Sequence, residues 1–325
     1  MVLDKPIFEK HKAHFTKINE ELASIFSSPV PLIEDIEKHV LLGHGKRLRP
    51  LFFILCCNLC NYQGKDLYRL STVFEYIHTA SLLHDDVIDN AEIRRKKGST
   101  NHLWGNKTAI LEGDYLYLKS SFIALDSNNL LFLKRLAEIS IQMVEGQILE
   151  LIQMDNWETT KERYMQIITA KTGSLISAAC SCGAIISEVE TEAEQALAKF
   201  GLKAGIAFQL IDDLLDYTSS EEMFGKHVGK DLEEGKITLP LIYTLPRLKI
   251  TEKKRLEALF KDRRATEEDC RGIAELVRNS GAIDQTLDEA RAYIDKAANC
   301  LISFPDSNAK RDLLELNQYI IERKY

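Results

Sequence analysis

Two short runs of aspartate, each at the end of an otherwise apolar helical stretch, constrain this chain more than any other feature. They are Asp85–Asp89 and Asp212–Asp216, and both have the form Asp-Asp-x-x-Asp. One such run alone would more often be a solvated helix end. On a helix, Asp85 and Asp89 are one turn apart on the same face, so their charges repel each other. Because carboxylate oxygens are the ligands that hard divalent cations prefer, the two runs predict divalent-metal sites on helices.

The rest of the sequence also predicts an all-α fold. No stretch shows the sustained alternation of apolar and polar residues that a half-buried strand needs. The chain has no linker, no low-complexity segment and no repeat beyond the two acidic runs, and 45% of its residues are hydrophobic, as is ordinary for a globular protein. We therefore expect a single domain over residues 1–325, built as a bundle of long helices.

Composition argues against several classes of function. A net charge of −7 disfavours nucleic-acid binding, which needs a basic face. The first residues lack the apolar segment of a signal peptide, and the longest apolar stretches, Leu51–Cys60 and Leu175–Ile186, are too short or too rich in serine to span a bilayer. The seven cysteines lie in apolar helical stretches, which indicates buried, reduced thiols rather than a zinc site. We therefore expect a cytoplasmic protein without a transmembrane segment.

Positive charge gathers in four places. Gly43–Pro50 combines two glycines with three cations where one helix ends and another begins, which indicates an anion site, although a basic loop that caps helix carbonyls is the alternative. Residues 92–106 lack hydrophobic periodicity, which predicts a loop. Its four consecutive cations at 94–97 are either a solvated charged run or a phosphate-binding segment. Residues 171–173 place Lys-Thr-Gly inside a helix, where the glycine indicates a functional kink. Residues 221–236 form a lysine-containing loop.

The helix that leads into the first acidic run also carries Glu75-x-x-His78. Such a pair is half of a di-iron site in a helical bundle, but no second pair occurs, so we reject that reading. His78 precedes Asp85 by seven residues, about two turns, and so shares its face. A lone histidine on a helix is usually structural, but this alignment favours a ligand contact.

Acidic runs together with basic segments indicate a substrate that carries a diphosphate neutralised by magnesium. The chain lacks a Gly-x-x-x-x-Gly-Lys-Ser/Thr sequence, which argues against nucleotide hydrolysis, and we find no Ser/His/Asp or Cys/His nucleophile set.

On these motifs, the sequence resembles the trans-isoprenyl diphosphate synthases, the all-trans polyprenyl synthase family. The resemblance covers nearly the whole chain. Asp85–Asp89 and Asp212–Asp216 resemble the two aspartate-rich motifs of the family, and Gly43–Pro50 resembles its Gly-Gly-Lys-x-x-Arg-Pro turn, with His44 where the second glycine often stands. Three further stretches match: Lys171-Thr172, Phe208-Gln209 and Gly225-Lys226…Gly229-Lys230-Asp231…Lys236.

The resemblance implies an all-α homodimer with a central cavity between the two acidic motifs. It implies an enzyme that ionises an allylic diphosphate, such as farnesyl diphosphate, and joins the resulting cation to isopentenyl diphosphate, with about three magnesium ions per active site. The metal ligands would be Asp85, Asp89 and Asp212. The allylic diphosphate would be held by Arg94, Lys171, Lys226 and Lys236, and the cation would be stabilised by Thr172 and Gln209. Isopentenyl diphosphate would be held by Lys46, Arg49, His78 and Arg95, with Asp86, Asp213 and Asp216 in supporting positions.

Product length depends on the residues that precede Asp85. In short-chain members of the family, aromatic residues four and five positions before this aspartate close the pocket, whereas here Ser81 and Ala80 are small. The resemblance therefore implies a tunnel that continues past one helical turn and a long product of about C35 to C45, with C40 favoured. The floor is expected among Phe52, Phe122, Leu136 and Met143.

Several other readings remain open. A shorter-chain geranylgeranyl or farnesyl diphosphate synthase and the catalytic subunit of a heteromeric synthase are alternatives. A class I terpene cyclase would lack the second aspartate run and the Gly43–Pro50 turn, and a regulatory subunit would be expected to lose aspartates or basic contacts.

Overall fold

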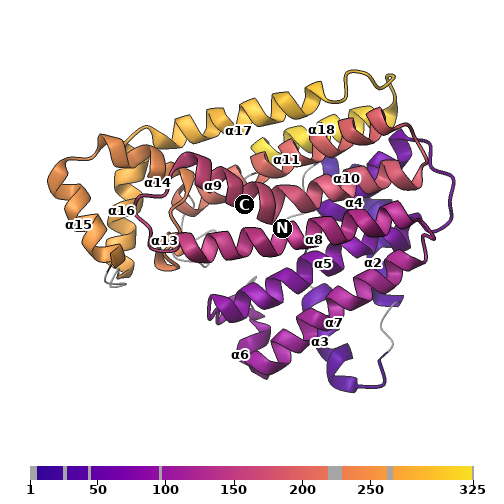
Figure 1. Cartoon of the computed structure of the whole chain (residues 1–325), viewed down its shortest axis with the longest axis horizontal. Helices are drawn as coiled ribbons and strands as arrows, with labels where there is room; N and C mark the ends of the chain where they lie inside the picture. The colour runs from indigo at the N-terminus through magenta and orange to yellow at the C-terminus, as the bar shows by residue number, and fades with distance from the viewer. Residues whose placement is uncertain are drawn as a thin grey trace. The chain divides into compact units, whose positions relative to one another are not determined.

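The prediction of an all-α fold is confirmed. The computed structural model describes residues 6–24, 28–42, 45–94, 97–218, 229–261 and 266–323. These residues are almost entirely helices and connecting turns, and their strand content is one short antiparallel pair, β1 (Ile93–Arg94) with β2 (Lys97–Gly98) (Figure 1).

The helices have the following bounds: α1 (Pro6–Lys10), α2 (Lys12–Ser24), α3 (Pro31–Leu41), α4 (Leu48–Leu59), α5 (Leu67–Ile88), α6 (Thr100–Trp104), α7 (Asn106–Leu125), α8 (Leu130–Gln153), α9 (Lys161–Ile168), the π-helical turn η1 (Thr169–Gly173), α10 (Ser174–Ile186), α11 (Thr191–Thr218), α13 (Lys230–Glu233), α14 (Leu239–Thr244), the 3-10 turn η2 (Leu245–Arg247), α15 (Ile250–Lys261), α16 (Glu267–Asn279), α17 (Ala282–Asn299) and α18 (Asn308–Glu322).

The chain forms two compact units. Unit 1 consists of Met1–Glu138, Ala178–Ala198 and Phe304–Leu313, and unit 2 consists of Ile139–Ser177, Lys199–Ser303 and Leu314–Tyr325. Helices α8, α10, α11 and α18 contribute residues to both units. The expectation of a single domain over residues 1–325 stays a prediction.

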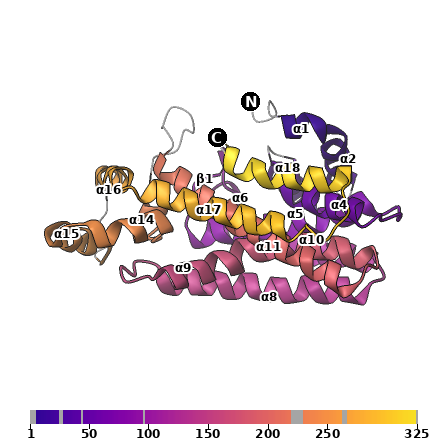
Figure 2. The ribbon, with the colours of Figure 1, turned by 90° about the horizontal axis from the view of Figure 1, so that it is seen from above.

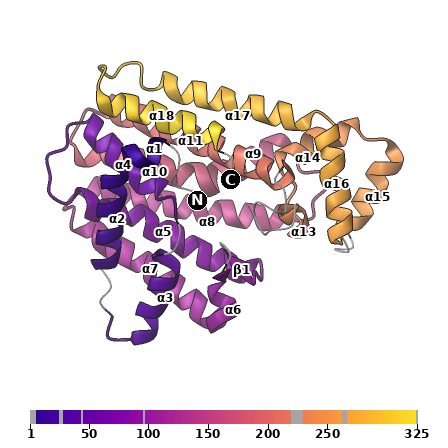
Figure 3. The ribbon, with the colours of Figure 1, turned by 180° about the vertical axis from the view of Figure 1, so that it is seen from behind.

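Unit 1 is organised around α5, the helix that ends in the first acidic run. Helices α4 and α7 pack against it, and Figure 3 shows these neighbours together with α2. Ten of the twelve residues of α4 are buried, as expected for a helix that is apolar nearly all round. The rings of Phe53 and Phe74 lie 5.2 Å apart, and Phe132 packs edge-on against both. This aromatic contact fixes α5 against its neighbours and so fixes where its acidic end lies within the unit.

Unit 2 is organised around the second half of α11, which ends in the second acidic run. Tyr217 at that end is fully buried in a core with residues of α13, α14, α15 and α16. Helix α14 packs against α16 and α17, which Figure 2 labels together with it. Helix α16 begins with a capping box between Thr266 and Asp269, which satisfies backbone N–H groups at its start.

One sequence expectation on the fold was wrong. Residues 92–106 were expected to be a loop, but this stretch contains β1, β2 and the five-residue helix α6. Strands of two residues and a helix of barely more than one turn are too short to show a hydrophobic period.

Candidate active site

In unit 1, the first acidic run lies at the end of α5 as the helical spacing predicts. The N–H of Asp89 donates to the carbonyl of Asp85 at 2.8 Å, so the two residues are one helical turn apart. Both side chains are half-buried, as is that of His78 two turns earlier. Asp86 is different: it is 2% exposed, and one carboxylate oxygen accepts a hydrogen bond from Nε of Arg94 at 2.5 Å. The structure therefore separates two accessible aspartates from a third that holds Arg94 in place.

The basic turn before α4 is fixed by a residue to which the sequence assigned no role. Arg47 caps α4 in a left-handed backbone conformation, with φ of 49°, and its side chain is buried. Its guanidinium donates to Glu75 and to the carbonyl of Leu41. This ion pair joins the basic turn to Glu75 on α5. Lys46 and Arg49 flank Arg47 and are half-buried.

The two small residues on α5 do not share one environment. Ala80 is 1% exposed, whereas Ser81 is half-buried and its hydroxyl donates to the carbonyl of His78 at 2.8 Å. Neither lines the pocket of about 60 Å³ that lies beside Asp86 in unit 1. Phe122 is 66% exposed on α7, so it lies outside the packed interior of unit 1 and does not form a floor there.

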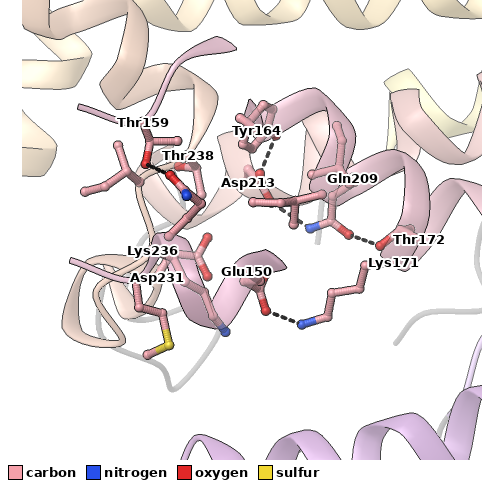
Figure 4. Close-up of a pocket in the computed structure, with 15 residues that line it drawn as sticks. Glu150, Thr159, Tyr164, Lys171, Thr172, Gln209, Asp213, Asp231, Lys236 and Thr238 are labelled. Atoms are coloured by element: carbon pink, nitrogen blue, oxygen red, sulfur yellow. Dashed lines mark hydrogen bonds and ion pairs between the residues drawn. The ribbon is translucent and has the colours of Figure 1, made fainter. Parts of the chain in front are cut away.

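In unit 2, four residues expected to act on the substrate line one pocket of about 120 Å³ (Figure 4). They are Lys171, Thr172, Gln209 and Lys236. They come from η1, from α11 and from the segment that follows α13, so their convergence is a property of the fold. The remaining lining residues are Glu150, Gln153, Met154, Thr159, Tyr164, Ile167, Ile168, Asp213, Asp231, Ile237 and Thr238.

A chain of hydrogen bonds crosses this pocket. The hydroxyl of Thr172 donates to Oε1 of Gln209 at 2.8 Å, and Nε2 of Gln209 donates to Asp213 at 2.6 Å. The hydroxyl of Tyr164 donates to the other oxygen of Asp213 at 2.5 Å (Figure 4). Burial raises the pKa of Asp213 to about 7, and the neighbouring charges of Asp212 and Asp216 also raise it. Asp213 thus orients Gln209, and through it Thr172, toward the pocket.

Both lysines of the pocket are paired with carboxylates. Nζ of Lys171 lies 2.5 Å from Glu150, and Nζ of Lys236 lies 2.6 Å from Glu234. These pairs hold the long side chains in defined positions, and a diphosphate that enters must share or replace the carboxylate partners.

The backbone that carries Lys171 and Thr172 is held by close helix contacts. The predicted kink is the π-helical turn η1, a type of turn that is frequent at functional sites. A Cβ on Gly146 of α8 would lie 2.8 Å from the Cβ of Ala170, and a Cβ on Gly205 of α11 would lie 2.7 Å from the Cα of Gly173. Because positions 146 and 205 are glycines, both α8 and α11 can pack closely against η1.

Of the three aspartates in the second acidic run, Asp213 lines this pocket, whereas Asp212 and Asp216 contact other parts of unit 2. Asp216 accepts hydrogen bonds from the backbone N–H groups of Lys230 and Asp231, each at 3.2 Å, and so caps the start of α13. Burial raises the pKa of Asp231, and the nearby charges of Asp216 and Asp213 add to the rise. Asp212 contacts Arg323 at 2.8 Å.

The donor set fits magnesium. Within the residues that the structure describes, no three His, Cys, Asp or Glu side chains lie together as a protein-only metal site. Mg²⁺ is usually held by one or two carboxylates together with water and substrate phosphates. Asp85 and Asp89 supply such a pair from one helix face, and Asp212 supplies a carboxylate in unit 2.

Two predicted substrate contacts, Arg95 and Lys226, lie outside the described residues, as do Gly43 and His44 of the basic turn. The residues that the sequence reasoning missed are Arg47, Tyr164 and Arg323. Their partners lie 28, 49 and 111 positions away in the chain, and no local pattern predicts contacts at such separations.

The chain is similar to known proteins along most of its length. A family model described as polyprenyl synthetase matches residues 30–277. The chain belongs to this family. The octaprenyl diphosphate synthase of Haemophilus influenzae is 31% identical over 312 residues, which cover 95% of this chain and 94% of that protein. The all-trans-nonaprenyl-diphosphate synthase (geranyl-diphosphate specific) of Rhodobacter capsulatus is 33% identical over 319 residues, which cover 98% and 96%.

Structural similarity is equally extensive. The crystal structure of a polyprenyl synthase from Caulobacter crescentus, complexed with calcium and isoprenyl diphosphate, has a TM-score of 0.94 and 35% sequence identity. The alignment covers 98% of this chain and 97% of that one. This polyprenyl synthetase family member is therefore a prenyltransferase, and the predicted fold class and family are both confirmed. None of the described helices has the length and apolar character needed to cross a membrane.

Proposed function

We propose that this protein is an all-trans polyprenyl diphosphate synthase that extends an allylic diphosphate, such as farnesyl diphosphate, with isopentenyl diphosphate. The observation that carries the proposal is the pocket in which Lys171, Thr172, Gln209 and Lys236 converge. The pocket also contains the carboxyl groups of Glu150, Asp213 and Asp231, and both lysines are paired with carboxylates. The lysines suit the anionic head of a substrate, and the dipoles suit a carbon that becomes positive during the reaction. Family membership and the relatives' names support the same chemistry.

Each group of residues has a role in this proposal. Asp85, Asp89 and Asp212 would hold the magnesium, about three ions by family resemblance, and the bound metal would supply positive charge that makes the diphosphate a better leaving group. Lys171, Lys236, Arg94 and Lys226 bind the diphosphate oxygens. The bond between the allylic carbon and the diphosphate oxygen breaks, and the oxygens of Thr172 and Gln209 stabilise the carbocation. Lys46, Arg49, His78 and Arg95 hold isopentenyl diphosphate, whose double bond attacks the cation. Loss of one proton, to the departing diphosphate, completes the five-carbon extension.

A long product, about C35 to C45 with C40 favoured, is the finer part of the proposal. Ala80 and Ser81 support it, because both are small and Ala80 lies in the interior of unit 1. The names of the relatives leave the length open, since one is an octaprenyl and another a nonaprenyl synthase.

We further propose a homodimer, located in the cytoplasm. Its support is a set of exposed apolar side chains on α7 and α8. On α7, Leu111, Leu118 and Phe122 are 67%, 68% and 66% exposed and share one face at intervals of seven and four residues. On α8, Ile141, Val144, Ile148 and Ile152 are 60%, 60%, 51% and 65% exposed with the same helical spacing. Exposed apolar surfaces of this kind mark protein interfaces.

The test is to incubate the purified protein with magnesium, farnesyl diphosphate and labelled isopentenyl diphosphate, and to size the products after removal of the diphosphate. We expect elongation to long products. Replacing Asp85 or Asp212 with Asn should abolish it, whereas Asp306→Asn, at an exposed ion pair with Arg311, should retain full activity. No elongation by the protein alone would contradict the proposal and favour a subunit of a heteromeric synthase. Release of the diphosphate with a cyclised product would favour a terpene cyclase.

A further inference from the structure

The last described residue of the chain reaches the second acidic run. Arg323 directly follows α18, and its side chain is 0% exposed. Nη2 of Arg323 lies 2.8 Å from Oδ1 of Asp212, whose side chain is 31% exposed. The C-terminal end of the described chain thus touches a carboxylate to which the proposed function assigns a metal.

Phe208, one helical turn before Asp212 on α11, fixes the guanidinium of Arg323. Its backbone carbonyl accepts a hydrogen bond from Nη2 at 2.5 Å, and the guanidinium carbon lies 3.7 Å from the centre of its ring. A guanidinium is planar and always charged, so stacking on a ring and a bond to a carbonyl leave it little freedom. Its direction toward Asp212 is therefore set before any ligand binds.

This arrangement holds the carboxylate of Asp212 from one side. The guanidinium contacts Oδ1, and the Asp212 side chain is 31% exposed. Groups that hold a metal-binding carboxylate from behind fix its orientation, and their loss typically lowers metal affinity or activity 10- to 100-fold. The positive charge also offsets the repulsion between Asp212 and its acidic neighbours.

We infer that Arg323 is a positioning residue for Asp212, which it orients for binding of a divalent cation together with a diphosphate. The inference deepens the proposed function and rests on it for the identity of the bound group. Arg323 also links α18 to α11, so the test must separate orientation of Asp212 from simple attachment of the helix.

Asn317 provides the matched control. It lies on α18, is 1% exposed, and donates to the carbonyl of Ile294 on α17 at 2.9 Å. Asn317→Ala should weaken the attachment of α18 while leaving the contact between Arg323 and Asp212 in place. Arg311 lies on α18 and forms an exposed ion pair with Asp306, which precedes the helix, so Arg311→Gln controls for loss of charge.

The experiment measures binding of Mn²⁺, as a spectroscopic substitute for Mg²⁺, by electron paramagnetic resonance in the presence of inorganic pyrophosphate. For Arg323→Gln we expect a 10- to 100-fold weaker affinity, with partial recovery in Arg323→Lys. Asn317→Ala and Arg311→Gln should bind like the unmodified protein. Circular dichroism melting establishes whether each variant is folded. If Arg323→Gln does not fold, Arg323→Lys takes its place and should bind Mn²⁺ more weakly than the unmodified protein.

Unchanged or tighter Mn²⁺ binding in a folded Arg323 variant would overturn the inference, as would equal weakening in Asn317→Ala. Absence of Mn²⁺ binding by the unmodified protein would also overturn it. The two hypotheses can fail separately. If the unmodified protein does not elongate isoprenoids but the Arg323 variants bind Mn²⁺ more weakly, the proposed function is contradicted and the positioning role of Arg323 is supported. In an active enzyme, we expect Arg323→Gln to raise the magnesium concentration needed for half-maximal rate.

Discussion

At the scale of single residues, Glu112 is an acid in an apolar setting. It lies on α7, is 3% exposed, and its Oε1 has no hydrogen-bond partner among the described residues. Burial raises the pKa of Glu112 to about 8, and the charge of Glu37 raises it further while Lys119 opposes the rise. A folded-state pKa above the ordinary 4.5 means that ionisation opposes folding. The penalty is absent below about pH 4.5 and grows as the pH rises to about 8.

We therefore expect Glu112→Gln, which cannot ionise, to gain stability relative to the unmodified protein as the pH rises. The gain between pH 5 and pH 8 should be about 3 kcal/mol, because one pKa unit corresponds to about 1.4 kcal/mol. Urea unfolding at several pH values measures it. Glu20→Gln, at an exposed site on α2, should show no such trend. A difference between Glu112→Gln and the unmodified protein that did not change with pH would rule out the raised pKa.

Ala80 tests product length at the same scale. An aromatic ring at this buried position on α5 should block a tunnel one turn below Asp85, so Ala80→Tyr should shorten the product to about C20 or less. Ala80→Ser keeps the side chain small and should leave the length unchanged. Chromatographic sizing of the dephosphorylated products decides between the outcomes. The tunnel hypothesis would not survive a full-length product from an active Ala80→Tyr enzyme.

At the scale of elements, the attachment of η1 should control the position of Lys171 and Thr172. A Cβ at Gly205 would lie 2.7 Å from the Cα of Gly173, a backbone atom that cannot move without shifting η1. We expect Gly205→Ala to destabilise unit 2 and to lower kcat at least tenfold, because small displacements of catalytic groups have large effects on rate. Steady-state kinetics and thermal melting are the measurements.

Gly272 on α16 is the matched control, since a Cβ there meets nothing within 4 Å. Gly272→Ala should leave activity unchanged and add up to about 1 kcal/mol of stability, because alanine is the better helix former. Equal activity in the two variants would show that close packing at η1 does not position the catalytic groups.

The helices and strands show which features of the fold and of the site could be predicted from the sequence. The long helices were predictable because their apolar residues recur with the helical period over many turns, and Asp85 with Asp89 followed from spacing alone. The family's motifs named Lys171, Thr172 and Gln209, and the structure brings them together. The roles of Tyr164 and Arg47 could not be predicted, because neither occupies a specified position of a sequence motif and each depends on a partner distant in the chain. The strand pair at 93–98 could not be predicted, because a strand of two residues is too short to show a hydrophobic period.

At the scale of the whole molecule, the exposed apolar faces of α7 and α8 predict association of two copies. Light scattering after size exclusion should give twice the chain mass of 37.0 kDa. A charge placed on either face would have to be buried at an interface, which opposes association strongly. Leu118→Glu and Val144→Glu should therefore yield monomers. Ile250→Glu makes the same chemical change at a 73% exposed position on α15 and should remain dimeric. A dimer that persisted in both Leu118→Glu and Val144→Glu would place the interface elsewhere.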